Sequence, residues 1–245
     1  MRFISFIALT MLANASFAAN GHFYAGVDAA ASYPQLSIDY PVIAYTSGVL
    51  ITDAYPIDDQ SNTASVIGLH AGYEYTGHDK KPAIALGLGV YTTPGNYQFN
   101  GGVIETAVGN EPAYLYDYTF AIKSTRLMAE AQFTWDHFQY LNPLLTIGAG
   151  PVWNQMSDYT ETVTSPNGFV ALPPFQNRTQ FNFAYQLGIG LCSEFNNKHE
   201  RIAVAYRYVN LGTTAFGARA EVYPFQLNTG TLSTNEVYVA YTHIM

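Results

Sequence analysis

The chain has 245 residues, of which 49% are hydrophobic, 15% aromatic and 11% charged. Ordinary soluble domains carry about 25% charged residues, so this composition argues against a soluble globule. The formal net charge of −8 argues against nucleic acid as a partner, because phosphate binding needs clustered positive charge.

The amino terminus has the pattern of a secretory signal peptide. A positive charge precedes the apolar run from Phe3 to Leu12, and the small residues Ser16 and Ala18 occupy the two sites that a signal peptidase reads. A membrane-spanning helix takes about 20 residues, so the apolar run is too short to be one. We therefore predict a signal peptide over residues 1–18 and a single mature domain over residues 19–245.

Beyond the signal peptide, the dominant pattern is an alternation with a period of two, which is typical of β-strands. In Thr179–Cys192 the odd positions from Phe181 to Leu191 are large and apolar, while the even positions from Gln180 to Gly190 are small or uncharged. The first set suits lipid contact, and the second suits the crowded interior of a narrow barrel. The alternation defines eight predicted strands, in chain order His22–Ser32, Asn62–Thr76, Ala83–Tyr91, Tyr114–Trp135, Leu144–Trp153, Thr179–Cys192, Arg201–Leu211 and Asn235–Met245.

The connections between the predicted strands alternate in length. Long irregular segments cover residues 33–60, 92–112, 154–177 and 212–234, and short turns cover residues 77–82, 136–143 and 196–200. An up-and-down barrel with both termini on the periplasmic side shows this order, because one membrane face carries tight turns and the other carries extended loops. The sequence therefore predicts an all-β protein, an eight-stranded antiparallel up-and-down transmembrane β-barrel with four long surface loops.

One predicted strand does not keep a single phase. From Leu127 to Trp135 the odd positions are outward and apolar, but Phe120 and Ile122 place large apolar side chains on the opposite parity. Two interpretations remain open. Either a β-bulge near Lys123 resets the register, or the strand projects beyond the bilayer.

Several ionisable side chains fall on the inward parity. They are Asp28, His70, Glu74, Arg126, Glu130, Arg207 and Glu236. An eight-stranded barrel is just wide enough to be filled by side chains, and buried charges persist when they are paired. We predict a polar network of His70, Glu74, Arg126, Glu130 and Arg207, in which the two arginines bond to the two glutamates. Cys192, the single cysteine, is expected to be a small inward-facing filler.

The segment Ala205–Gly212, with the sequence Ala-Tyr-Arg-Tyr-Val-Asn-Leu-Gly, precedes a closing amphipathic strand. Together with the eight strands, it resembles the OmpA/OmpX-like family of small Gram-negative outer-membrane barrels over essentially the whole mature chain. The resemblance implies a place in the bacterial outer membrane, contact with lipid and lipopolysaccharide, and insertion by the barrel-assembly machinery. Members of that family usually end on an outward aromatic residue, whereas this chain ends on Met245.

An enzymatic role has little support in the sequence. Lipid A deacylases are also eight-stranded barrels, and they place His and Ser two residues apart on one strand face, with a carboxylate nearby. No histidine of this sequence is followed by a serine two residues later; the histidines are His22, His70, His78, His137, His199 and His243. Their spacing does not match zinc or calcium ligands either. We therefore predict no catalytic residue, no cofactor and no metal site.

Three functional hypotheses follow. The first is a non-enzymatic barrel with a structural or adhesin-like surface role, because loops on a rigid scaffold are where binding usually resides. Its partner would be a host or surface ligand held by the long loops. The second is a narrow ion channel gated by exchange of salt-bridge partners in the lumen. A lipid-modifying enzyme is the third.

Overall fold

A computed structural model describes residues 21–37, 42–46, 50–59, 63–75, 82–107, 111–135, 141–164, 175–219 and 226–245. The regular elements among these residues are β-strands. None of the described residues belongs to a helix long and apolar enough to cross a membrane. The predicted signal peptide, residues 1–18, lies outside the described residues, as do most of the predicted turns 77–82 and 136–143.

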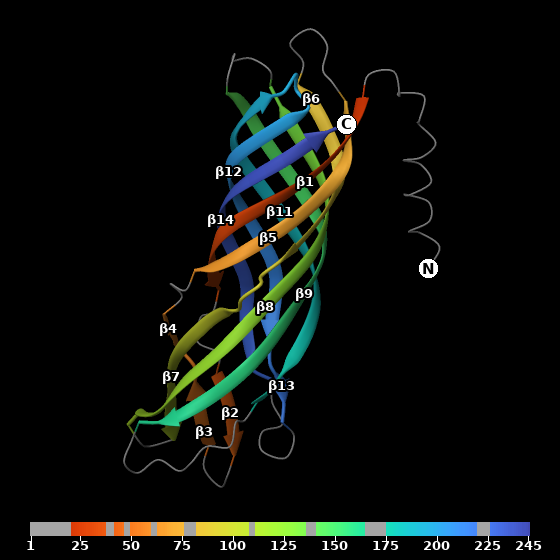
Figure 1. Cartoon of the computed structure of the whole chain (residues 1–245). Helices are drawn as coiled ribbons and strands as arrows, with labels where there is room; N and C mark the ends of the chain where they lie inside the picture. The colour runs from red at the N-terminus through yellow and green to blue at the C-terminus, as the bar shows by residue number, and fades with distance from the viewer. Residues whose placement is uncertain are drawn as a thin grey trace, which may run out of the picture.

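Eight antiparallel strands form a closed ring, as predicted (Figure 1). Each strand pairs with the next along the barrel, and β1 closes the ring by pairing with both β5 and β14. The barrel strands are β1 (Gly21–Leu36), β5 (Ala64–Tyr75), β6 (Ala83–Thr92), β8 (Ala113–Thr134), β9 (Asn142–Val163), β11 (Arg178–Phe195), β12 (Glu200–Ala215) and β14 (Asn228–Ile244). The carboxyl terminus lies at the end of the barrel where the turn Asn196–His199 joins β11 to β12, which we call the turn end; we call the other end the loop end (Figure 1).

The outer wall of the barrel is a band of exposed apolar side chains. Leu69 is 65% exposed and Phe183 is 68% exposed. All eight strands contribute to the band, for example through Val27, Leu69, Leu88, Leu127, Ile147, Phe183, Val204 and Val239. Soluble monomers rarely expose an apolar patch larger than a few hundred Å². A continuous band around a closed barrel is instead the surface of a transmembrane β-barrel.

Aromatic contacts mark the two edges of this band. At the turn end, Tyr73 packs against Phe23 with ring centroids 5.1 Å apart and against Tyr75 at 4.9 Å. Towards the loop end, Trp153 packs edge-on against Phe181 at 5.6 Å. Aromatic residues gather at the two interfaces of a membrane-spanning barrel, so these pairs delimit the spanning part of the strands.

Several strands continue past the loop-end aromatic pair. The strands β8 and β9 each have 22 residues, about twice the 9–11 that a bilayer requires. Shorter strands pair beside their extensions: β2 (Val42–Thr46), β3 (Leu50–Ala54), β4 (Ile57–Asp59) and β7 (Tyr97–Ala107), with the small pair β10 (Phe175–Gln176) and β13 (Gly217–Ala218). The expectation of irregular loops was therefore wrong for much of these segments, which form a sheet that projects from the barrel (Figure 1).

The strand β8 shows no register reset at Lys123, where pairing with β9 is regular. The irregularity lies instead on β9, where Asp158 and Tyr159 together oppose the single residue Phe120. This two-against-one arrangement is a β-bulge, and Asp158 adopts the left-handed conformation with a φ of 58°. Of the two interpretations, the projecting strand is therefore the one that the structure supports. Phe120 and Ile122 break the sequence pattern because their inward surroundings change from polar to apolar.

The inward side of the loop end is filled by aromatic rings. Phe120 stacks on Phe99 at 5.1 Å and meets Phe216 edge-on at 5.3 Å, and Tyr159 packs against Phe175 at 5.1 Å. We call this buried group the aromatic cluster; it comprises Tyr55, Phe99, Tyr118, Phe120, Tyr159, Phe175 and Phe216. Its members come from four strands and two connecting segments, so ring packing is what orders the projecting sheet.

Candidate functional site

A fully buried polar layer of the lumen centres on Glu236 of β14. Its carboxylate accepts hydrogen bonds from Arg126 Nη1 at 2.9 Å and Nη2 at 2.8 Å, a bidentate pair. It also accepts one from Arg207 Nε at 2.8 Å. The three side chains are at most 2% exposed. Paired geometry of this quality is what allows ions to persist in a low-dielectric interior.

Tyr91 of β6 connects this layer to the middle of the lumen. The guanidinium carbons of Arg126 and Arg207 lie 4.7 Å and 4.6 Å from the centroid of its ring, which is cation–π contact. Its hydroxyl donates to Glu130 Oε1 at 2.5 Å. On the other side, Arg207 Nη1 lies 3.5 Å from Asp28 Oδ2. One tyrosine thus contacts both arginines and one of the buried acids.

Two inward glycines make room for the ring of Tyr91. A Cβ on Gly68 would lie 2.5 Å from carbon atoms of that ring, and a Cβ on Gly89 would lie 2.6 Å from it. Both distances are far inside van der Waals contact. The small inward residues that identified the barrel in the sequence therefore also shape the pocket for a large aromatic residue.

Glu130 of β8 has hydrogen-bond donors rather than an arginine beside it. Besides the Tyr91 hydroxyl, Gln186 Nε2 donates to Glu130 Oε1 at 2.6 Å. A carboxylate only accepts, so this contact fixes the orientation of the Gln186 amide and turns its oxygen away from Glu130. Glu130 is 7% exposed and Gln186 is 4% exposed.

A second ion cluster lies nearer the turn end. Arg201 of β12 donates to Glu74 through Nη1 at 2.7 Å and Nη2 at 2.9 Å. The same guanidinium donates to Glu194 Oε1 at 2.6 Å. Arg201 therefore has two carboxylate partners, whereas Arg126 pairs with one carboxylate, that of Glu236, among the residues that the structure describes.

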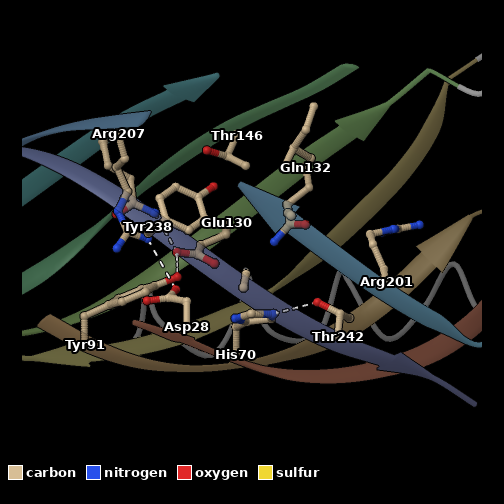
Figure 2. Close-up of a pocket in the computed structure, with 14 residues that line it drawn as sticks. Asp28, His70, Tyr91, Glu130, Gln132, Thr146, Arg201, Arg207, Tyr238 and Thr242 are labelled. Atoms are coloured by element: carbon tan, nitrogen blue, oxygen red, sulfur yellow. Dashed lines mark hydrogen bonds and ion pairs between the residues drawn. The ribbon is translucent and has the colours of Figure 1, made fainter. Parts of the chain in front are cut away.

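His70 lies between the two ion clusters (Figure 2). Its Nε2 is 3.2 Å from the hydroxyl oxygen of Thr242. Figure 2 shows the side chains of His70, Thr242 and their neighbours pointing from the walls of the barrel into a small cavity. The cavity is lined by Asp28, His70, Tyr91, Glu130, Gln132, Leu144, Thr146, Gln186, Arg201, Ala203, Arg207, Tyr238, Ala240 and Thr242.

All five residues of the predicted polar network are buried in the lumen, but the predicted pairing was wrong. Arg126 and Arg207 bond to Glu236, and not to Glu74 or Glu130. The reason is geometric: tilted strands bring together residues that are far apart along the chain, and the stagger decides which side chains share a level. Predicted as a buried filler, Cys192 is a buried free thiol.

Sequence reasoning missed the roles of Arg201 and Tyr91. Arg201 has the same parity as the inward Arg207, but its place beside a turn concealed its partnership with Glu74. Tyr91 has the opposite parity to the outward Val90, so its inward direction was readable at the end of the predicted strand. Neither the cation–π contacts nor the glycine pocket of Tyr91 has a signal in one sequence.

A second feature lies on the outside of the projecting sheet, beyond Trp153. A groove of about 400 Å³ opens beside the bulge of β9, and its exposed lining is uncharged apart from Asp158. The groove is lined by Gln98, Phe99, Asn100, Thr119, Phe120, Ala121 and Asp158. We call its exposed members the polar groove: Gln98, Asn100, Thr119 and Asp158. Amides, a hydroxyl and a carboxylate suit hydrogen bonding to a polar partner.

Metal-ligating side chains are not grouped in the described part of the chain. Within it, no group of three or more His, Cys, Asp or Glu side chains is arranged to hold a metal ion. The Nε2 atom of His70 faces the hydroxyl of Thr242 rather than the carboxylate of Glu74. Of the remaining histidines, His78 and His137 lie outside the described residues.

No protein-family model matches the sequence, and no curated protein matches it. Among solved structures, the chain is similar to Neisserial surface protein A, NspA, with 12% identity, a TM-score of 0.46 and coverage of 90% of this chain and 96% of that one. It is similar to Ail, the attachment invasion locus protein of Yersinia pestis, with 15% identity, a TM-score of 0.36 and coverage of 91% and 99%. The outer-membrane protease OmpT of Escherichia coli matches with 10% identity, a TM-score of 0.40 and coverage of 92% and 96%.

Proposed function

We propose that this protein is a non-enzymatic barrel of the bacterial outer membrane, with a closed lumen and a structural or surface-interaction role carried by its loop end. Lipid and lipopolysaccharide would surround the apolar band, and the barrel-assembly machinery would insert the chain after export. The projecting sheet would be the part that meets a host or surface ligand. Fractionation of cells, with heat-modifiable gel migration as the sign of a folded barrel, tests the location.

The observation that carries the proposal is that the lumen is closed at two levels, by the ion pairs around Glu236 and by the aromatic cluster. A permeating ion would have to break the hydrogen bonds between Glu236 and its two arginines. It would then have to pass between the packed rings of the aromatic cluster and the fully buried apolar side chains Ile122 and Met156. A filled barrel of this kind suits a scaffold better than a conduit.

The projecting sheet supports the surface role. Its inner side is held rigid by the aromatic cluster, and its outer side presents the polar groove. Preorganised surfaces bind with less loss of conformational entropy than mobile loops do. The rigid sheet is therefore the surface that we expect a partner to contact.

Conductance separates this proposal from the channel hypothesis. We expect the purified barrel to give no single-channel steps in planar bilayers, both in the wild type and after the substitution Glu111→Gln on the exposed surface. Replacing Glu236 with Gln breaks the ion pairs with Arg126 and Arg207 but leaves the aromatic cluster in place. We therefore expect this variant to give no single-channel steps either. Steady conductance in the wild type would contradict the closed-lumen reading.

Surface binding is tested by displaying the protein on a non-adherent Gram-negative host. We expect adhesion to cultured cells, and at least tenfold weaker adhesion after combining Asn100→Ala with Thr119→Ala in the polar groove. The matched control is Lys198→Ala at the turn end, which would leave adhesion unchanged. If the groove variant and the turn variant adhere equally well, the partner does not contact the polar groove.

A further inference from the structure

The middle of the lumen carries more negative than positive side chains. Within the described residues, the acids Asp28, Glu130 and Glu236 are linked, directly or through Tyr91, to two guanidinium groups, those of Arg126 and Arg207. All five are at least nine-tenths buried. An uncompensated ion is unfavourable in such surroundings, so this group of side chains favours one further positive charge. Arg201 does not supply it, because this guanidinium already has Glu74 and Glu194 as partners.

Buried oxygen atoms without a hydrogen-bond partner line the cavity at this level. The cavity-facing oxygens are Asp28 Oδ1, Thr146 Oγ1 and Gln186 Oε1; among the described residues, Asp28 Oδ1 and Gln186 Oε1 have no such partner, and Thr146 Oγ1 faces the Tyr238 hydroxyl. Their side chains are 6%, 7% and 4% exposed. Asp28 is held by Arg207 through its other oxygen, and Gln186 is held by Glu130 through its nitrogen, so both present a free acceptor to the cavity. Buried polar atoms of this kind call for a ligand or a water.

The cavity has room for one particle of that size. About 20 Å³ is open to the centre of a water-sized sphere, and about 10–15 Å³ is enough for a single water. Carboxylate, amide and hydroxyl oxygens are the ligands that hard cations prefer. A divalent ion would reverse the charge imbalance rather than remove it, and Mg²⁺ in particular sheds its water reluctantly.

We propose that the lumen binds one dehydrated alkali-metal cation, held by the carboxylates of Asp28 and Glu130 and by the side-chain oxygens of Thr146 and Gln186. These residues come from β1, β8, β9 and β11, so the ion ties four strands of the ring together. Its entry is from the turn end, because the aromatic cluster closes the loop end. The site is a structural cation site inside the barrel and does not depend on the surface role.

The test compares cations at constant ionic strength. Unfolding by urea is followed in uncharged detergent micelles at pH 8. Sodium or potassium chloride is exchanged stepwise for N-methyl-D-glucamine chloride, whose cation is too large for the cavity. We expect a saturable response, in which the equilibrium constant for unfolding falls about tenfold at a concentration ten times the dissociation constant.

Three variants complete the experiment. Asp28→Asn is expected to abolish the difference between the cations, and Thr146→Val, which keeps every charge, is expected to weaken the response by raising the dissociation constant. Glu111→Gln, an exposed acid outside the lumen, is the matched control and keeps the full response. Thr146→Val retains a measurable barrel even if Asp28→Asn fails to fold.

Three results would overturn the proposal. One is equal stability of the wild type in sodium, potassium and N-methyl-D-glucamine. Another is an equal response in Thr146→Val and Glu111→Gln, which is a general salt effect. The last is a barrel that is stabilised by acidification but does not respond to sodium at any pH. That result would assign the missing charge to a proton on Glu130, Asp28 or His70. The titratable tyrosines that face the cavity are Tyr91 and Tyr238.

Discussion

Removing the shared acceptor of the lumen arginines is the sharpest test of how the barrel is held together. In Glu236→Gln the carboxylate that binds both Nη1 and Nη2 of Arg126 becomes a neutral amide. Its charge-assisted bond from Arg207 is weakened at the same time. Arg207 keeps Asp28 nearby at 3.5 Å, whereas Arg126 is left with the face of Tyr91. The main cost is therefore the stranded Arg126.

The magnitude follows from the burial of the pair. Breaking a buried ion pair by removing one partner costs about 3–5 kcal/mol, and Arg126 and Glu236 are 2% and 0% exposed. Since about 1.4 kcal/mol is a factor of ten, the equilibrium constant for folding should fall at least about 100-fold. Urea unfolding followed by tryptophan fluorescence and by heat-modifiable gel migration measures this loss.

Two further variants show whether the loss of stability comes from the broken ion pair rather than from the loss of any carboxylate. Glu111→Gln on the surface should stay within about 0.5 kcal/mol of the wild type. Adding Arg126→Met to Glu236→Gln removes the stranded charge and should recover part of the loss. A loss below about 1 kcal/mol in Glu236→Gln, or no recovery in the double variant, would refute the claim that the bidentate pair holds the lumen.

Three further substitutions test other parts of the account. Gly68→Ala places a Cβ 2.5 Å from the Tyr91 ring and should cost about 1–3 kcal/mol in urea unfolding, whereas a neutral result would mean that the ring has room to move. Phe120→Ala should cost about 3–5 kcal/mol of loop-end stability, seen as faster proteolysis of the projecting sheet while the spanning barrel still shows heat-modifiable migration. Burial raises the pKa of Glu161, eight residues beyond Trp153 on β9, above its unfolded value. Its contribution to stability is therefore full below the unfolded pKa and lost as the pH rises through the folded pKa, so proteolysis of the loop end should be slower at pH 4 than at pH 7, and Glu161→Gln should remove that difference.

The alternation of side chains alone determined the class of fold and the direction of each spanning side chain. A β-strand has a period of two whatever its neighbours are, and lipid on one side with a filled lumen on the other demands opposite chemistries of the two faces. For this reason Thr179–Cys192 was sufficient to identify a barrel strand, and Arg126, Glu130 and Arg207 could be placed inside before any coordinates were known.

Partnerships inside the lumen were decided only by the tertiary structure. Arg126 and Glu236 are 110 residues apart, and which acid lies level with which arginine depends on the tilt and stagger of the closed ring, which leave no mark on the pattern of one strand. The same holds for the loop end, where a bulge at Asp158 turns Tyr159 inward and lets β8 continue past the lipid band. Local periodicity sets the face on which a side chain lies, whereas closure of the barrel sets its neighbours.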